Sequence, residues 1–245
     1  MTQRLAAAIV AVLAARGVAA AQTQTATPRA RLDEVQRLAS VADYTGAMNL
    51  FETVKAQSPD AIESLDGLKI AIVYLHTGNT AKFLDLTNWL IARYKSPKTS
   101  TDAERSVKAY IIWKGATDPK ILAHAVEMTK FASEHAQASG EGQYQGFFDT
   151  SRGIALYRVG RYAEAAQWLP KQLSHDDVLV RSLALGFNAM NEWKLGHRDK
   201  AKELMAQVRR ELPKLPAPGS PTFGADWTDV LITKMVVAEA ETFVK

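Results

Sequence analysis

The chain has 245 residues, of which 47% are hydrophobic and none is cysteine. This apolar content excludes a chain that is disordered throughout, and the lack of cysteine excludes disulfides, thiolate metal sites and cysteine nucleophiles. The net charge is +4, from 30 basic and 26 acidic residues that are scattered along the chain. A charge that is so balanced and dispersed predicts no nucleic-acid partner.

The first 21 residues have the layout of a secretory signal peptide. A short basic start precedes the apolar run 5–15, LAAAIVAVLAA, and small residues then lead to Ala21. This run is shorter than the roughly 20 apolar residues that span a bilayer, so we expect no stable membrane span after cleavage. Because Arg16 interrupts the pattern, export to the periplasm or medium and a cytosolic chain with an uncleaved N-terminus are both open. Residues 22–28 are predicted to be a polar linker.

From Pro28 onward the apolar residues follow helical spacing, without useful strand-like alternation. The spacing predicts one α-helical domain over 29–245, made of five helix pairs and a last helix. The paired ranges are 29–40 with 44–57, 61–76 with 80–94, 102–114 with 119–138, 144–159 with 162–173, and 178–195 with 198–212. A proline-rich connector, expected to be extended, covers 213–225, and 226–244 is predicted to be a capping helix.

Several residue pairs mark where these helices begin and end. The dipeptide Gly78-Asn79 suits a helix end with positive φ, and Gly160 and Gly196 are predicted to form the turns of the fourth and fifth pairs. Asp118 followed by Pro119 predicts a capped helix start with proline in the first helical position.

One stretch of the sequence is repeated. Residues 156–166, LYRVGRYAEAA, recur in looser form as residues 193–202, WKLGHRDKAK. Each copy has a large apolar residue about one turn before a glycine and an alanine five residues after it. The two copies are separated by about the length of one helix pair. Recurrence at this period predicts an array of helix pairs, in which no single pair buries its apolar face alone.

These residues resemble the tetratricopeptide repeat. The fourth pair matches the pattern of that family at Gly153, Leu156, Gly160, Tyr162, Ala165 and Leu169, the fifth at Ala189, Gly196, Ala201, Met205 and Val208, and the first at Tyr44, Ala47, Phe51, Val54 and Pro59. From Asp118 onward the chain is also similar to repeat arrays found behind signalling modules in large bacterial proteins. The resemblance implies an all-α solenoid of helix pairs and carries no catalytic residues.

The resemblance also implies a groove lined by the first helix of each pair. The implied lining residues are Thr150, Ile154, Tyr157 and Arg158 in the fourth pair and Met190, Trp193 and Lys194 in the fifth. Aromatic side chains beside Arg or Lys suit peptide side chains and carboxylates. An alternative is that Tyr157 and Trp193 only complete the core between helices.

Motifs for catalysis, cofactors or metals are lacking in the sequence. The five histidines are dispersed, and none forms the i, i+4 pair of a helical metal site. His175, Asp176 and Asp177 are the strongest acid or base cluster, and a loop that caps the next helix is the favoured explanation. We therefore expect a non-enzymatic protein or peptide interaction module, a scaffold or adaptor of the bacterial envelope or secreted fraction. An envelope enzyme with dispersed active residues and a cytosolic scaffold are the alternatives.

Overall fold

The computed structural model describes residues 26–212, 215–217, 220, 223–224 and 226–244. Over these residues every regular element is a helix and no strand is present, which confirms the predicted all-α class. In the same part of the chain, none of the helices has the length and apolar content that crossing a membrane requires. The predicted signal peptide, most of the linker at 22–28 and about half of the connector at 213–225 lie outside the described residues.

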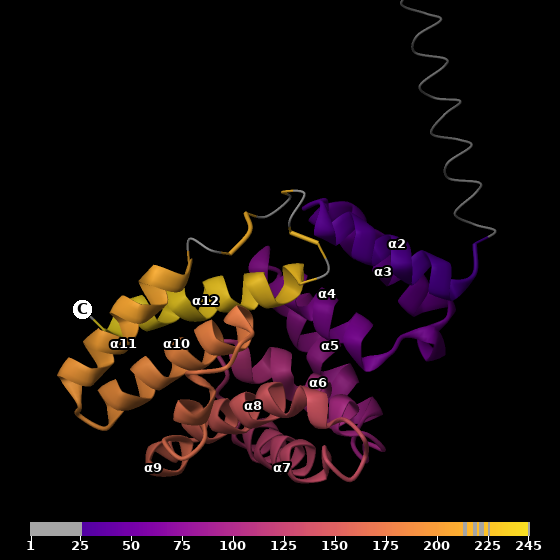
Figure 1. Ribbon diagram of the computed structural model, residues 1–245. Coiled ribbons are helices and arrows are strands. Elements are labelled where there is room, and N and C mark those ends of the chain that lie inside the picture. The colour runs from indigo at the N-terminus through magenta and orange to yellow at the C-terminus, as the bar shows by residue number, and fades with distance from the viewer. Residues whose placement is uncertain (1–25, 213–214, 218–219, 221–222, 225, 245) are drawn as a thin grey trace, which may run out of the picture.

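The helices follow one another as antiparallel pairs (Figure 1). The pairs are α2 (Pro28–Ser40) with α3 (Tyr44–Gln57), α4 (Ser64–His76) with α5 (Thr80–Arg93), α6 (Ser100–Ile112) with α7 (Pro119–His135), α8 (Gln145–Arg158) with α9 (Tyr162–Ala165), and α10 (Val178–Lys194) with α11 (Arg198–Glu211). The short 3-10 helices are η1 (Pro59–Ala61), η2 (Gly142–Tyr144) and η3 (Leu169–Gln172), and α12 (Trp227–Phe243) is the last helix. The predicted ranges are close to these bounds, except in the fourth pair.

Capping side chains and turn glycines fix the helix ends. The carboxylates of Asp118 and Asp177 accept backbone N–H bonds at the starts of α7 and α10. Gly78, Gly160 and Gly196 have φ angles of +76°, +79° and +89° and lie at the turns that the sequence predicts. Other residues would be strained there, so these glycines set the turn inside three of the pairs.

The second helix of the fourth pair differs from the prediction. The pattern predicts one helix over 162–173, but α9 ends at Ala165 and η3 begins at Leu169. Pro170 has no N–H to donate and disfavours helical backbone in the residue before it, so the α-helix ends ahead of it. Ala165 is nevertheless fully buried, as expected for a small residue between two helices.

The first helices of the second to fifth pairs pack side by side. Helix α4 contacts α6, α6 contacts α8, and α8 contacts α10, while each also contacts the helix that follows it. We call α4, α6, α8 and α10 the inner helices. The main cluster of buried apolar side chains extends through them, an arrangement that is compatible with a helical repeat.

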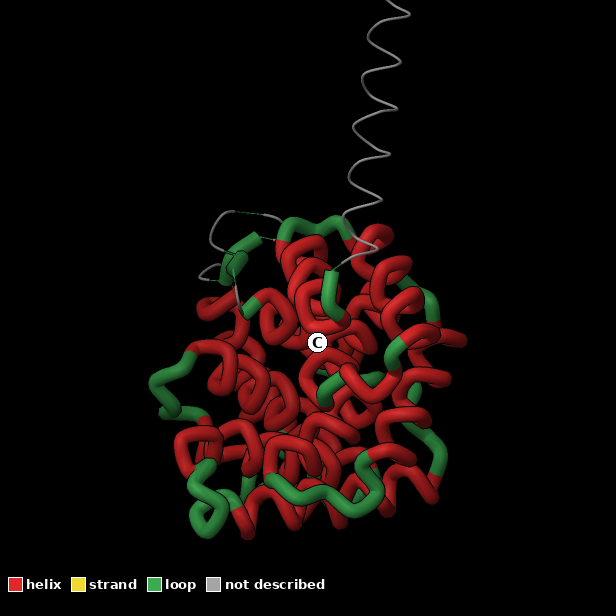
Figure 2. Tube along the Cα trace, turned by 90° about the vertical axis from the view of Figure 1, so that its right-hand side faces the viewer, coloured by secondary structure: helices red, strands yellow, loops and turns green. Residues whose placement is uncertain are grey.

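The last helix, α12, packs on the inner helices (Figures 1 and 2). It contacts α4, α10 and α11, and ion pairs join it to Lys108 of α6 through Asp229 and to Arg158 of α8 through Glu239. The sequence predicts a helix that caps the end of the array. In the structure this helix contacts α10 and α11 of the last pair, and it also reaches α4 of the second pair.

Candidate functional site

The seven residues expected to line a groove lie on α8 and α10. Four of them are buried: Thr150, Ile154, Tyr157 and Met190. The ring of Tyr157 packs against the rings of Phe187 and Tyr162, with centroid distances of 5.7 and 5.6 Å. Burial raises the pKa of Tyr157 to about 12. In this conformation Tyr157 therefore belongs to the core between helices, the alternative that the sequence left open.

Arg158 joins three helices. Its guanidinium group donates two hydrogen bonds to the carboxylate of Glu239 in α12, at 2.6 and 2.7 Å. The same group donates to the carbonyl oxygens of Ile111 and Ile112, at 2.7 and 2.9 Å, where α6 ends. Both charged side chains are only 7% exposed. Paired, charge-assisted bonds of this kind are strong and geometrically specific, so Arg158 is fully engaged while α12 is in place.

Trp193 and Lys194 lie at the C-terminal end of α10. Trp193 is half-buried, and the guanidinium carbon of Arg198 lies 3.7 Å from the centroid of its ring. The Lys194 ammonium lies 5.1 Å from the ring centroid of Phe243 in α12. Two of the expected groove residues, Arg158 and Lys194, therefore contact α12 directly.

Helices α10 and α12 approach closely at Gly186. A Cβ atom at this position would lie 3.0 Å from Cγ1 of Val236, so glycine provides the room for the contact. Ser182 lies one turn before Gly186, and Thr233 lies one turn before Val236. Both hydroxyl groups are buried and lack a hydrogen-bond partner among the described residues. A buried polar group left unpaired costs about 1 to 3 kcal/mol, so these hydroxyls lower the stability of the folded chain near this contact.

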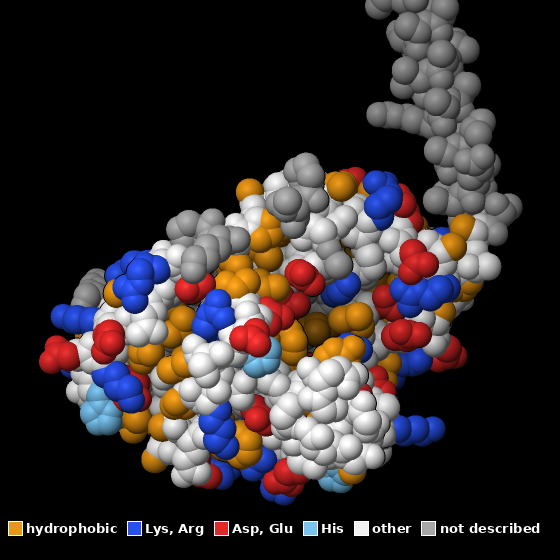
Figure 3. Space-filling model, viewed as in Figure 1, with side chains coloured by type: hydrophobic (Ala, Val, Ile, Leu, Met, Phe, Trp, Pro, Cys, Tyr) orange, Lys and Arg blue, Asp and Glu red, His pale blue; other side chains and the backbone are white. Residues whose placement is uncertain are grey.

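A cavity of about 170 Å³ opens where α4, α6, α8 and α12 meet (Figure 3). In the space-filling view, hydrophobic side chains show in a hollow in this region, with acidic and basic side chains at its border. The apolar lining consists of Leu65, Leu68, Tyr144, Phe147 and Phe148, and the polar lining of Lys69, Thr101, Glu104, Arg105, Lys108, Thr228 and Asp229. A cavity of about 150 Å³ holds benzene in another protein, so this one suits a group of one ring.

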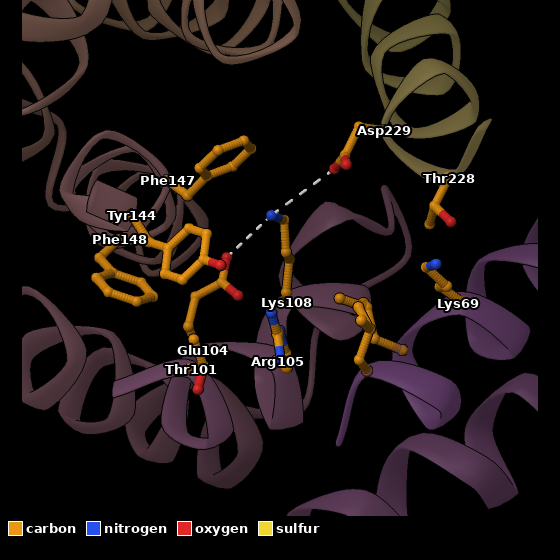
Figure 4. A pocket seen from close by; sticks show the side chains of 12 residues that line it. Lys69, Thr101, Glu104, Arg105, Lys108, Tyr144, Phe147, Phe148, Thr228 and Asp229 are labelled. Carbon is orange, nitrogen blue, oxygen red and sulfur yellow. Dashed lines mark ion pairs between the residues drawn. The ribbon is translucent and has the colours of Figure 1, made fainter. Parts of the chain in front are cut away.

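Lys108 lies between two carboxylates in this cavity (Figure 4). Its ammonium is 3.0 Å from Oε1 of Glu104 and 4.0 Å from Oδ1 of Asp229. The side chains of Lys108 and Glu104 are 5% and 4% exposed, and Glu104 also accepts a hydrogen bond of 2.7 Å from the Ser151 hydroxyl. Burial disfavours the charged ammonium, but the two carboxylates outweigh this effect and raise the pKa of Lys108.

The other charged groups of the cavity are less well neutralised. Burial raises the pKa of Asp229, against the opposing effect of Lys108, while 33% of the Asp229 side chain stays exposed. Lys69 and Arg105 are half-buried, and neither forms a salt bridge with a described residue. Burial lowers the pKa of Lys69 although the carboxylates of Asp229 and Asp66, which lie beyond salt-bridge distance, act in the opposite direction. The cavity therefore contains two cations that lack a close carboxylate partner.

The cluster of His175, Asp176 and Asp177 forms the start of α10. Asp177 accepts a hydrogen bond from the backbone N–H of Leu179 at 2.7 Å, and Nδ1 of His175 accepts one from the backbone N–H of Asp177 at 3.1 Å. These bonds are those of a helix cap, the favoured explanation of the cluster. Among the described residues, no group of three or more His, Cys, Asp or Glu side chains is placed to hold a metal ion.

The charged residues of the cavity are not among the site residues that the sequence predicts. Glu104 and Lys108 are four residues apart on one helix, a spacing that is typical of solvent-exposed ion pairs. One signal was present, since Lys108 is followed by the apolar run AYII at 109–112 and preceded by Val107. A charge inside so apolar a segment indicates a buried position with a partner.

Comparisons of the chain with protein-family models, with curated proteins and with solved structures find no match. The class of protein is therefore defined by its fold and site. It is an all-helical chain of packed helix pairs whose inner helices are covered by its own last helix.

Proposed function

We propose that this chain is a non-enzymatic protein-binding module, a tetratricopeptide-like array that acts in the bacterial cell envelope or the secreted fraction. Its inner helices bind a helix of a protein partner, and α12 is the intramolecular occupant of that surface. The observation that supports this proposal is that expected groove residues already hold a helix. Arg158 binds Glu239, and Lys194 lies against Phe243.

The contacts of α12 define the chemistry of the partner. A helix that replaces α12 leaves Arg158 buried, and a buried charge without a partner is strongly destabilising. The partner helix therefore carries a carboxylate at the position of Glu239. It is apolar on the side that faces α10, where Gly186 admits a side chain such as that of Val236.

Two energetic features favour exchange of α12 for a partner helix. The unpaired hydroxyls of Ser182 in α10 and Thr233 in α12 reduce the stability of the folded state in which both are buried. A buried ion pair such as Arg158 with Glu239 adds little net stability, because the cost of removing both charges from water offsets their attraction. Because α12 is tethered to the inner helices, it competes with a partner at an effective concentration on the order of millimolar. The partner helix therefore needs a dissociation constant for the inner helices that is well below millimolar.

A disulfide between α10 and α12 tests this proposal. The natural chain has no cysteine, so Gly186→Cys combined with Val236→Cys introduces a single pair. A Cβ atom at position 186 would lie 3.0 Å from Cγ1 of Val236, and this close approach is compatible with the Cβ separation of about 3.5 to 4.5 Å that a disulfide needs. We expect the oxidised chain to lose partners that it captures from the envelope fraction, and the reduced chain to regain them.

The control is Val236→Cys alone, which should capture the same partners under both conditions. Hydrogen exchange gives a second readout, because a bound partner should speed the exchange of α12 amides in the unlocked chain. Equal capture by the oxidised and reduced double variant would remove the inner helices as the binding surface. The proposed exchange of helices would then be wrong.

Export is tested separately by the N-terminus of the mature protein. If the first 21 residues are a signal peptide, N-terminal sequencing of the protein from its native host should begin at about Gln22. A mature chain that retains residues 1–21 would contradict export and favour the cytosolic scaffold. The binding proposal for the inner helices would be unaffected.

A further inference from the structure

The cavity beside α12 has more positive than negative charge on its wall. Lys69, Arg105 and Lys108 contribute three cations, whereas Glu104 and Asp229 contribute two carboxylates. Lys108 lies between both carboxylates, at 3.0 and 4.0 Å. Lys69 and Arg105 therefore have no carboxylate within salt-bridge distance. The wall as a whole carries one positive charge in excess, which one bound anion would neutralise.

We propose that this cavity binds a small monocarboxylic acid whose apolar part is the size of one aromatic ring. This site goes beyond the proposed function, because it does not depend on exchange of α12 for a partner. The carboxylate of the ligand lies between Lys69 and Arg105, and its ring lies against Phe147 and Phe148.

The acid end of the site is formed by helices α4, α6 and α12. Lys69 and Thr228 lie beside each other in Figure 4, and Arg105 extends from the neighbouring helix α6. The Thr228 hydroxyl is buried and has no hydrogen-bond partner among the described residues. A carboxylate here accepts bonds from two cations and a hydroxyl, and it relieves the repulsion between Lys69 and Arg105. Bonds of this charge-assisted type are stronger than neutral ones.

The ring end of the site is formed by η2 and α8. The side chains of Tyr144, Phe147 and Phe148 lie on one side of Lys108 in Figure 4, and Leu65 and Leu68 complete the apolar lining. The Lys108 ammonium is 5.0 Å from the ring centroid of Phe147. The volume of about 170 Å³ fits one ring. Since α12 covers the inner helices beside the cavity, the occupant is a compact molecule and not an extended chain.

The test uses the full mature chain and three probes in isothermal titration. The probes are 3-phenylpropionate, its primary amide, and acetate. The amide keeps the shape of the acid without its charge, and acetate keeps the charge without the ring. We expect 3-phenylpropionate to bind at least tenfold more tightly than either of the other probes. Equal binding of the acid and the amide would overturn the proposal. So would the absence of binding when the acid is present at about ten times a dissociation constant of 1 mM.

Two matched pairs of variants locate the binding site. Lys69→Gln and Arg105→Gln should each weaken binding of 3-phenylpropionate at least tenfold. Lys202→Gln and Arg210→Gln, which change exposed residues of α11, should bind it as the parent does. Because Lys69 and Arg105 have no salt-bridge partner among the described residues, their variants should stay folded, with a small loss of thermal stability for Lys69→Gln from the contact of Lys69 with the Trp227 ring. Folded Lys69 and Arg105 variants that bind normally would overturn the assignment.

A peptide probe distinguishes a free acid from the end of a protein chain. The tripeptide Gly-Gly-Phe has the same ring and carboxylate at its C-terminus. We expect it to bind no better than 3-phenylpropionate, since the cavity holds one ring and no backbone. Tenfold tighter binding of the peptide would overturn the small-acid proposal and would assign the cavity to partner binding instead.

Discussion

Replacing Arg158 with methionine is expected to lower the free energy of unfolding by about 3 to 5 kcal/mol, the usual loss when one member of a buried ion pair is removed. The substitution leaves the Glu239 carboxylate buried without its partner. It also removes the hydrogen bonds to the carbonyl oxygens of Ile111 and Ile112. Urea denaturation of parent and variant, followed by circular dichroism, measures the difference.

The matched control is Arg161→Met, which removes an arginine from the turn after the same helix. Arg161 pairs with Glu164 in solvent, both side chains being 47% exposed, so this change should have little effect. A second variant combines Arg158→Met with Glu239→Met and should recover part of the loss, since no buried charge is then left alone. An Arg158→Met chain as stable as the Arg161→Met chain would contradict the role given to this ion pair.

Replacing Trp227 with alanine should cost a similar amount, about 3 to 5 kcal/mol, because it empties a large buried site. Trp227 is 1% exposed and is among the largest fully buried side chains of the described chain. Its ring lies 6.0 Å from the Lys69 ammonium of α4, so it packs the first turn of α12 against the second helix pair. The loss should appear as a lower urea midpoint and as faster hydrogen exchange in α12.

Trp89→Ala is the control for this prediction. Trp89 is a half-buried residue of α5 that lies against Lys55 and Arg93, away from α12. Its removal should cost less and should leave hydrogen exchange in α12 unchanged. If Trp227→Ala destabilised the chain no more than Trp89→Ala, the first turn of α12 would not be the anchor that we describe.

The helices and their turns could be predicted from the sequence because they depend on local chemistry. Tyr44–Gln57 is a helix in both the prediction and the structure, and Asp118 with Pro119 begins α7 as expected. Apolar spacing, a capping side chain and a turn glycine act within a few residues of the helix that they define. The sequence also indicates the break in the second helix of the fourth pair, because Pro170 lies inside the range 162–173 that was predicted to be one helix.

The position of α12 could not be derived from local pattern. The apolar spacing of residues such as Trp227, Val230 and Val236 predicts a helix, but it does not predict which helices this one contacts. Ile232 and Val237 are buried as well, so the helix is buried on most of its sides. A helix with apolar residues on several sides packs against several neighbours, and the local pattern does not identify them.

The cavity could not be predicted because its residues come together only through α12. Glu104 and Lys108 share a helix, but Asp229 follows Lys108 by more than a hundred residues. The distances between helices of different pairs decide which charged side chains of the cavity have a salt-bridge partner. Lys69 and Arg105 are ordinary surface residues in the sequence, and only the packing of α4, α6 and α12 places them in a cavity.

The position of α12 also bears on how the chain loses its structure. In a simple repeat array each unit contacts only its neighbours, so units at one end can unfold while the rest persist. Here α12 contacts both α4 and α10, which belong to the second and fifth pairs. Detaching either pair therefore also disturbs the other through α12. The inner helices and α12 should consequently melt together in one all-or-none step, because α12 joins pairs that are far apart along the chain.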